Sequence, residues 1–176
     1  DPDIHKLKDS ISSGSRGKLR SVMGVYNKGL LNNGSHMLDL LLLLLGPLNL
    51  VFVGKPSYDW FVDDPSVPVC LVSAEGALVS LSCGDAKDFA LFELQFIFDS
   101  GVLVMEDGGM RWRERVREKS PLFQGYRRLD GGTIRNGAYI SSMLGALDNI
   151  WDVIMNGAEL LSDVSSALET HILCEK

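Results

Sequence analysis

The residues best suited to chemistry lie together between Tyr26 and Asp39. His36 stands at the start of an apolar segment, and Asp39 follows three residues later. Residues three apart share roughly one face of a helix, so Asp39 is placed to orient the imidazole ring. A helix N-terminus disfavours the imidazolium and leaves a neutral imidazole able to exchange a proton near physiological pH. These residues alone leave two interpretations open, a structural histidine and a catalytic one.

The apolar segment itself predicts the helix that must carry His36. Ser35 is a candidate N-cap, the interior runs from Met37 to Leu45, and Gly46-Pro47 is a typical helix stop. The segment is apolar nearly all round, which indicates a buried helix. Before it, residues 18–27 favour a strand, and the glycines and asparagines of residues 29–34 favour a loop.

The remaining patterns predict an α+β fold. Residues 2–12 and the ranges 137–156 and 163–175 have helical spacing. Short strand-like segments fill the middle of the chain, at residues 48–54, 68–74, 76–83, 89–99, 101–106 and 109–118. Their close spacing suits antiparallel neighbours. We therefore expect a mostly antiparallel open β-sheet with helices packed on one face. The other face is a candidate oligomer interface, unless it is covered within the same chain.

Composition limits the classes of function. The chain has 176 residues, 45% of them hydrophobic, and a net charge of −6, which argues against nucleic acid as a partner. The apolar run from Leu40 to Leu45 is far shorter than the roughly 20 residues that a membrane span needs, so no membrane association is expected. Three cysteines without a CxxC pair favour a reduced, cytoplasmic setting, in which they are buried small hydrophobes. No metal-binding pattern is apparent.

A run of alternating arginines comprises Arg111, Arg113, Arg115 and Arg117. On a strand these four guanidinium groups would line one face and could cradle a diphosphate. We favour a charged edge strand that is protected against pairing, or a salt-bridged subunit contact.

The stretch YNKGLLNNGSHMLDLLLLLLG, residues 26–46, resembles the hallmark of the glucose-fructose oxidoreductase and inositol dehydrogenase family, Gfo/Idh/MocA. The later segments FELQFIFDSGVLVMEDGG and SSALETHILCE agree with the same family pattern, so the resemblance extends over essentially the whole chain. It implies an NAD(P)-dependent oxidoreductase that acts on a hydroxyl of a sugar, cyclitol or nucleotide sugar. It also implies a homo-oligomer.

The resemblance assigns roles to individual residues. His36 matches the family histidine that acts with a lysine on the sugar hydroxyl as hydride passes to or from the nicotinamide. The family often has Asp four residues before this histidine, where this chain has Asn32. Since an amide cannot exchange a proton as a carboxylate can, Asn32 is expected to bind a hydroxyl or to tune His36. Tyr26, Lys28 and Asn33 are further candidate substrate ligands, although an ordinary strand end with a solvated charge is the alternative for the first two.

The same resemblance describes the domain organisation. Family members place an N-terminal Rossmann domain, with the glycine-rich fingerprint and a lysine in a Glu-Lys-Pro motif, before a domain of this type. Neither motif is found here, and Lys55-Pro56 lies after the helix that carries His36. We therefore expect residues 1–176 to form a single C-terminal substrate-binding and oligomerisation domain, with no cofactor-binding residues of its own and inactive alone. The alternative is a non-catalytic binding or dimerisation module of the same fold.

Overall fold

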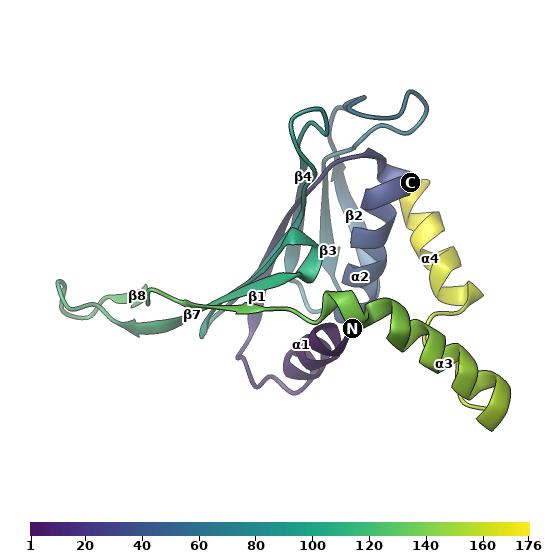
Figure 1. The fold of residues 1–176 in the computed structure, drawn as a ribbon. Coiled ribbons are helices and arrows are strands. Elements are labelled where there is room, and N and C mark those ends of the chain that lie inside the picture. Colours follow the sequence, from purple (N-terminus) through teal and green to yellow (C-terminus); the bar gives the residue numbers. More distant parts are fainter.

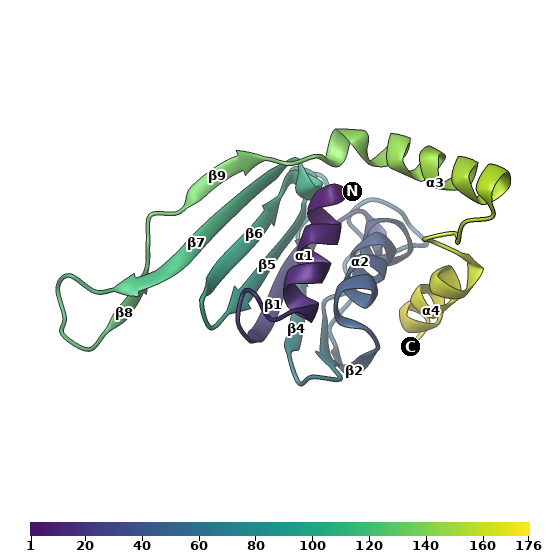
Figure 2. The same cartoon turned by 90° about the horizontal axis from the view of Figure 1, so that it is seen from below.

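The computed structural model describes residues 1–176 as one open sheet with helices on one side (Figures 1 and 2). The helices are α1 (Pro2–Ser12), α2 (Ser35–Leu45), α3 (Ser142–Asn156) and α4 (Val164–Cys174). The strands are β1 (Leu19–Tyr26), β2 (Leu48–Val53), β3 (Val69–Ser73), β4 (Leu78–Cys83), β5 (Phe92–Phe98), β6 (Gly101–Glu106), β7 (Arg111–Lys119), β8 (Arg127–Leu129) and β9 (Thr133–Asn136). The predicted α+β class is confirmed.

The sheet follows the order β2-β3-β4-β1-β5-β6-β7-β8, with β9 also paired to β7. Every pair is antiparallel except β1 and β4, which run parallel with Val22 opposite Val79. The pair is parallel because the chain leaves β1 through α2 and passes along β2 and β3 before it returns as β4. The sheet is therefore mostly antiparallel, as the strand spacing predicted.

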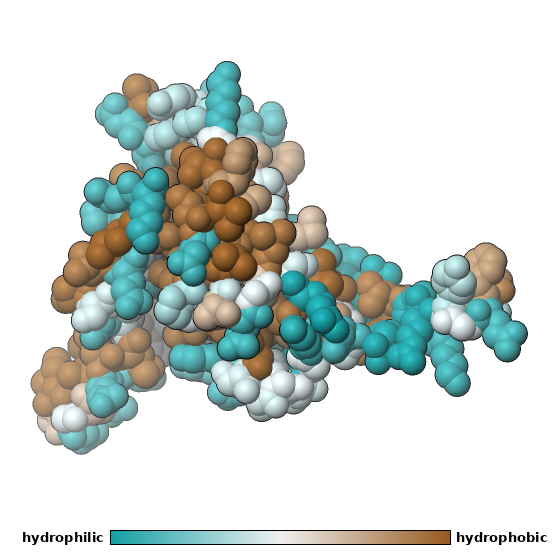
Figure 3. Space-filling view, turned by 180° about the vertical axis from the view of Figure 1, so that it is seen from behind, coloured by the Kyte–Doolittle hydropathy of each residue, from teal (hydrophilic) through white to brown (hydrophobic).

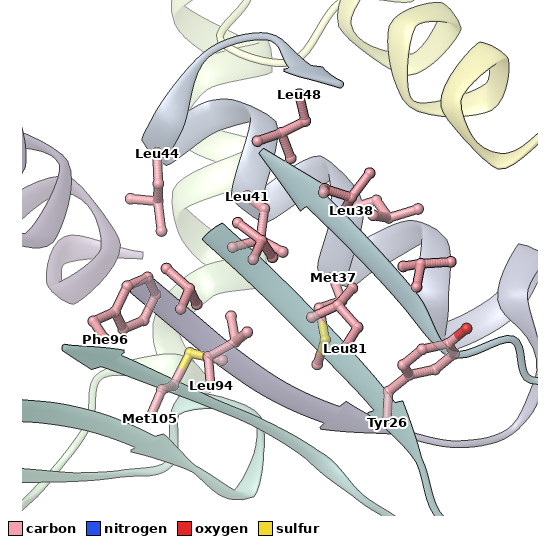
Figure 4. Close-up of a cluster of buried hydrophobic side chains, with 14 of the residues drawn as sticks. Tyr26, Met37, Leu38, Leu41, Leu44, Leu48, Leu81, Leu94, Phe96 and Met105 are labelled. Atoms are coloured by element: carbon pink, nitrogen blue, oxygen red, sulfur yellow. The ribbon is translucent and has the colours of Figure 1, made fainter. Parts of the chain in front are cut away.

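The core lies between the sheet and its layer of helices. Leucine is a strong helix former, and α2 presses Met37, Leu38, Leu41 and Leu44 onto the sheet (Figure 4). Gly24 on β1 leaves room for this contact, because a Cβ there would lie 2.7 Å from side-chain carbons of Leu81 and Leu94. Close packing against β1 thus fixes where the first residues of α2 lie.

The opposite face of the sheet carries no helix, so the chain itself does not cover both faces (Figure 2). Side chains alternate along a strand, so Val22 and Val79 point to the core while Met23 and Leu78 point away from it. Met23 is 53% exposed and Leu78 is 47% exposed. The bare face is therefore partly apolar.

Several local expectations need correction. Residues 29–34 are helical rather than a loop, and residues 89–91 precede β5 instead of belonging to it. The arginine-rich strand is not an edge strand, because β7 pairs with β6 on one side and with β8 and β9 on the other. The three cysteines are half-buried rather than buried, and none forms a disulfide. No helix is long and apolar enough to cross a membrane.

Candidate functional site

The residues before His36 form a π-helix from Gly29 to Gly34 that runs directly into α2. It starts at Lys28 and Gly29, both with positive φ, at 69° and 90°. Ser35 does not cap α2, as the sequence suggested, because Gly34 precedes it in helical conformation and the Ser35 hydroxyl donates to the carbonyls of Leu31 and Asn32. His36 therefore lies inside a continuous helical segment and not at a free helix N-terminus. Single π-turns of this kind are rare and occur frequently at functional sites.

Two aspartates from the β2–β3 connection hold the π-helix in place. Asp64 accepts hydrogen bonds from the backbone N–H groups of Leu31 and Asn32, at 2.8 and 3.0 Å. Asp59 accepts from the N–H of Lys28 at 2.8 Å and from the hydroxyl of Ser66 at 2.8 Å. Burial would raise the pKa of the Asp59 carboxyl, but these hydrogen bonds outweigh it and lower the pKa below its usual value. Both carboxylates thus act as anchors for the turn.

His36 and Asn33 line one cavity of about 540 Å³. The imidazole has no hydrogen-bond partner within the chain, so both ring nitrogens are available to a ligand. The cavity walls come from the start of α1, the π-helix, α2, the start of β5, the end of β6 and the start of α3, with the residues next to them. Besides His36 and Asn33, the lining residues are Asp1, Ile4, Leu40, Ala90, Leu91, Phe92, Glu93, Met105, Asp107, Gly108, Met110, Tyr139 and Ser142. An apolar cleft with a few polar groups is the usual form of a small-molecule site.

The electrostatic character of the cavity is acidic. Its lining includes Asp1 and Asp107 but no lysine or arginine, and Asp107 pairs at 3.7 Å with Arg111, which lies outside the lining. Glu93 also borders the cavity, although its side chain points to the bare face of the sheet because Leu94 beside it points to the core. Burial, together with the nearby Glu106 and Asp107 carboxylates, raises the pKa of Glu93. Because no lysine or arginine lines it, the cavity suits hydroxyl groups better than phosphate.

The other predicted residues are placed apart from the cavity. Asn32 is exposed and donates its amide to the carbonyl of Lys28 at 3.1 Å. Lys28 lies with its Nζ 5.4 Å from the ring centre of Trp60. Asp39 accepts from the hydroxyl of Thr170 on α4 at 3.0 Å. Of the residues predicted from sequence, only His36 and Asn33 are brought together on the cavity wall.

Tyr26 is fully buried in the hydrophobic cluster (Figure 4), and its hydroxyl bonds to the backbone of Val67. The hydroxyl donates to the Val67 carbonyl at 2.8 Å and accepts from the Val67 N–H at 2.9 Å. Burial raises the pKa of Tyr26 well above its ordinary value. The phenol thus ties β1 to the β2–β3 connection that also carries Asp59 and Asp64.

The sequence did not predict the cavity residues that come from the second half of the chain. Asp107, Tyr139 and Ser142 lie 71 to 106 residues after His36 along the chain, and no local pattern connects them to it. One signal was present: the Asp107-Gly-Gly sequence indicates a tight turn, and Asp107 adopts a positive φ of 51°. Tyr139 and Ser142 lie between the end of β9 and the first turn of α3, and no comparable sequence pattern marks them.

The arrangement can bind and deprotonate a hydroxyl. An unpartnered imidazole can exchange a proton with a bound ligand, and the Asn33 amide can donate to or accept from a neighbouring hydroxyl. Tyr139 and Ser142 add further hydroxyls to the lining. The chemistry that these groups support is proton transfer at an oxygen atom, with a polyhydroxylated ligand as the best match.

Neither a scan of protein-family models nor a search of curated proteins finds a match to this chain. Solved structures do match in fold. The similar structures include a candidate NADPH-dependent oxidoreductase from Desulfitobacterium hafniense, with a TM-score of 0.76 and 17% identity over 97% of this chain and 57% of that one. They also include the WlbA dehydrogenase from Bordetella pertussis in complex with NADH and UDP-GlcNAcA, with a TM-score of 0.73 and 16% identity over 98% of this chain and 57% of that one.

A third similar structure is KijD10, a 3-ketoreductase from Actinomadura kijaniata in complex with NADP, with a TM-score of 0.70 and 16% identity over 99% of this chain and 56% of that one. At this level of identity the likeness concerns the fold. The chain spans slightly more than half the length of each of these oxidoreductases.

Proposed function

We propose that this chain is the C-terminal, substrate-binding domain of an NAD(P)-dependent oxidoreductase of the Gfo/Idh/MocA family, acting on a hydroxyl of a sugar, cyclitol or nucleotide sugar. The observation that carries the proposal is the placement of His36 and Asn33, which share a cavity beside a π-turn. The fold shared with nicotinamide-dependent oxidoreductases supports it.

His36 is the proposed proton acceptor and donor. In the oxidative direction its neutral imidazole takes the proton of the substrate hydroxyl as the carbon loses hydride, and in the reductive direction it returns that proton to the new alkoxide. The nicotinamide, when bound, accepts or supplies the hydride. Asn33 holds an adjacent hydroxyl, and the lack of any intramolecular partner for His36 leaves the ring free to do this work.

The other predicted residues support this pair in the proposal. Tyr26 positions the π-helix through Val67, and Asp39 fixes α2 against α4 through Thr170. Asn32 stabilises the π-helix, because its side-chain amide donates a hydrogen bond to the carbonyl of Lys28. Lys28 remains a candidate contact for an anionic group on a larger substrate, outside the acidic cavity.

A second domain is proposed to hold the cofactor, and the surface of α3 supports this. No residue of α3 is buried, yet its apolar residues recur at helical spacing. Among them, Leu144 is 64% exposed, Leu147 is 56% exposed and Trp151 is 63% exposed. Figure 3 shows hydrophobic side chains on this projecting helix. A domain packed on α3 would also close the cavity, because Ser142 belongs to both. Without it the chain is expected to be inactive.

The substrate class and the assembly are part of the same proposal. The WlbA structure contains UDP-GlcNAcA, which supports a nucleotide sugar as one class to test. A homo-oligomer would use the bare face of the sheet, where Met23 and Leu78 are exposed. A cytoplasmic location agrees with three cysteines that are all unpaired.

The test is nicotinamide reduction by the full-length protein across a panel of sugars, cyclitols, sugar acids and nucleotide sugars. His36→Ala is expected to lower kcat by about 100-fold or more, the usual contribution of a general acid or base. His171→Ala is the matched control, because His171 is an exposed histidine on α4 that pairs only with Glu175, at 3.4 Å. Absence of turnover on every substrate, with NAD(P) still bound, would favour the non-catalytic module instead.

A further inference from the structure

The hairpin formed by β7, β8 and β9 extends beyond the rest of the sheet (Figures 1 and 2). Strand β6 pairs with β7 only as far as Val116, which lies opposite Gly101. From Arg117 to Lys119, β7 pairs with β8 alone. Residues 117–129 therefore form a two-stranded ribbon with no sheet or helix behind it, and an isolated ribbon of this kind is marginally stable in water.

The tip of the ribbon is apolar although solvent surrounds it. Leu122 is 79% exposed, Phe123 is 64% exposed and Tyr126 is 72% exposed. The rings of Phe123 and Tyr126 meet edge to face, with their centres 6.0 Å apart. Aromatic side chains exposed at the end of a projecting arm are typical anchors for a protein partner.

The hairpin has the opposite charge to the rest of the molecule. Residues 111–136 contain eight Lys and Arg against three Asp and Glu, a net charge of +5. The other residues contain nine Lys and Arg against twenty Asp and Glu, a net charge of −11. Glu106 pairs with both Arg111 and Arg113, but Arg117, Lys119 and Arg127 on the ribbon form no ion pair. Figure 3 shows the arm as largely hydrophilic.

A complementary surface exists on the connections β2–β3 and β4–β5, which this hairpin cannot reach within one chain (Figure 1). There Trp60 is 56% exposed and Phe89 is 64% exposed. Exposed carboxylates at Asp63 and Asp88 lie in the same two connections. Apolar anchors and basic residues on the hairpin would thus meet exposed aromatic rings and acidic groups on the connections.

We propose that the basic hairpin of residues 111–136 docks on the acidic, aromatic connections of a second copy of this chain. A second copy is favoured over nucleic acid because the remaining charge of −11 would repel phosphates but attracts a hairpin of charge +5. This contact is distinct from one through the bare face of the sheet, and it does not depend on the proposed catalytic activity.

The test is the self-association constant of the full-length protein, measured by analytical ultracentrifugation. Arg117→Glu with Arg127→Glu is expected to raise the dissociation constant by about 100-fold, because like charges would then face each other. Lys8→Glu with Lys18→Glu makes the same change in net charge on exposed residues elsewhere and is expected to leave the constant unchanged. Raised salt should weaken the wild-type contact.

A charge-swap experiment identifies the acceptor surface. The variant Asp63→Lys with Asp88→Lys should associate as weakly as the hairpin variant, since each then opposes like charges. A mixture of the two variants should associate again, because both reciprocal contacts become complementary. A wild-type monomer, an assembly insensitive to the hairpin variant, or a mixture that fails to associate would each overturn the proposal. A wild-type protein that stays monomeric and binds duplex DNA would overturn the proposal and identify nucleic acid as the partner of the hairpin.

Discussion

At the residue scale, the polar side chains near His36 in the sequence have two different roles. His36 and Asn33 face the cavity, whereas Tyr26, Lys28 and Asp39 direct their polar groups at the protein itself. The sequence identified the histidine and its neighbourhood, because a cluster of polar residues beside an apolar helix is visible locally. It could not separate ligand contacts from supporting bonds, since the partners of the supporting residues, Val67 and Thr170, come from distant segments.

The hydroxyl of Tyr26 offers one test of whether Tyr26 supports the fold rather than contacting a ligand. Tyr26→Phe leaves the Val67 N–H and carbonyl without partners in a buried site, which should lower the free energy of unfolding by about 2 kcal/mol. Urea denaturation of the full-length protein measures the change. Tyr58→Phe, at a tyrosine that is 62% exposed, is the matched control and should change stability by less than about 0.5 kcal/mol. Equal effects of the two substitutions would contradict the assigned role.

The pKa of Asp59 predicts a pH dependence. Because this pKa is lower in the folded state than in the unfolded state, the carboxylate stabilises the fold above the unfolded pKa, near about 4, and loses that contribution as pH falls through the folded pKa. The wild type should therefore be more stable than Asp59→Asn at neutral pH, and the difference should shrink below about pH 4. Denaturation midpoints recorded across pH measure it. A difference that stays constant into acid would show that Asp59 is not an ionised anchor.

At the element scale, hydrophobic periodicity predicted most of what positions the site. The helix at Pro2–Ser12, the helix stop at Gly46 and the C-terminal helix, which spans Val164–Cys174, are all confirmed. The π-helix was missed because Asp59 and Asp64 fix it from more than 30 residues away, by bonds that no local pattern reveals. Strands β8 and β9 were missed because they are only three and four residues long and are defined by pairing with β7.

Helix α3 carries the element-scale prediction. If a second domain packs on it, Leu147→Ser and Ile154→Ser should each lower the unfolding free energy of the full-length protein by about 2 kcal/mol, the usual contribution of a buried aliphatic side chain. Asp148→Ser, at another exposed position of the same helix, should have an effect below about 0.5 kcal/mol. Chemical denaturation distinguishes the two outcomes. Small effects at all three positions would mean that α3 remains exposed to solvent.

At the scale of the whole molecule, the chain presents surfaces that its own core does not cover. Helix α3 begins at the cavity with Ser142 and exposes apolar side chains, and the basic hairpin projects from the far edge of the sheet (Figure 2). The first suits a domain that completes the site, and the second suits an acidic neighbour. The sequence predicted a helix within residues 137–156 and the arginine-rich strand, but their separation in space depends on the order of strands in the sheet.

The most direct test of the central claim is the transfer of deuterium from substrate carbon to nicotinamide by the full-length protein. A sugar or nucleotide sugar deuterated at the reacting carbon is supplied with oxidised NAD or NADP, and the reduced cofactor is analysed by mass spectrometry. We predict that the label appears on the nicotinamide and that His36→Ala lowers its rate of appearance by about 100-fold while cofactor affinity is kept. Transfer at the wild-type rate in His36→Ala, or no transfer from any substrate, would contradict the account.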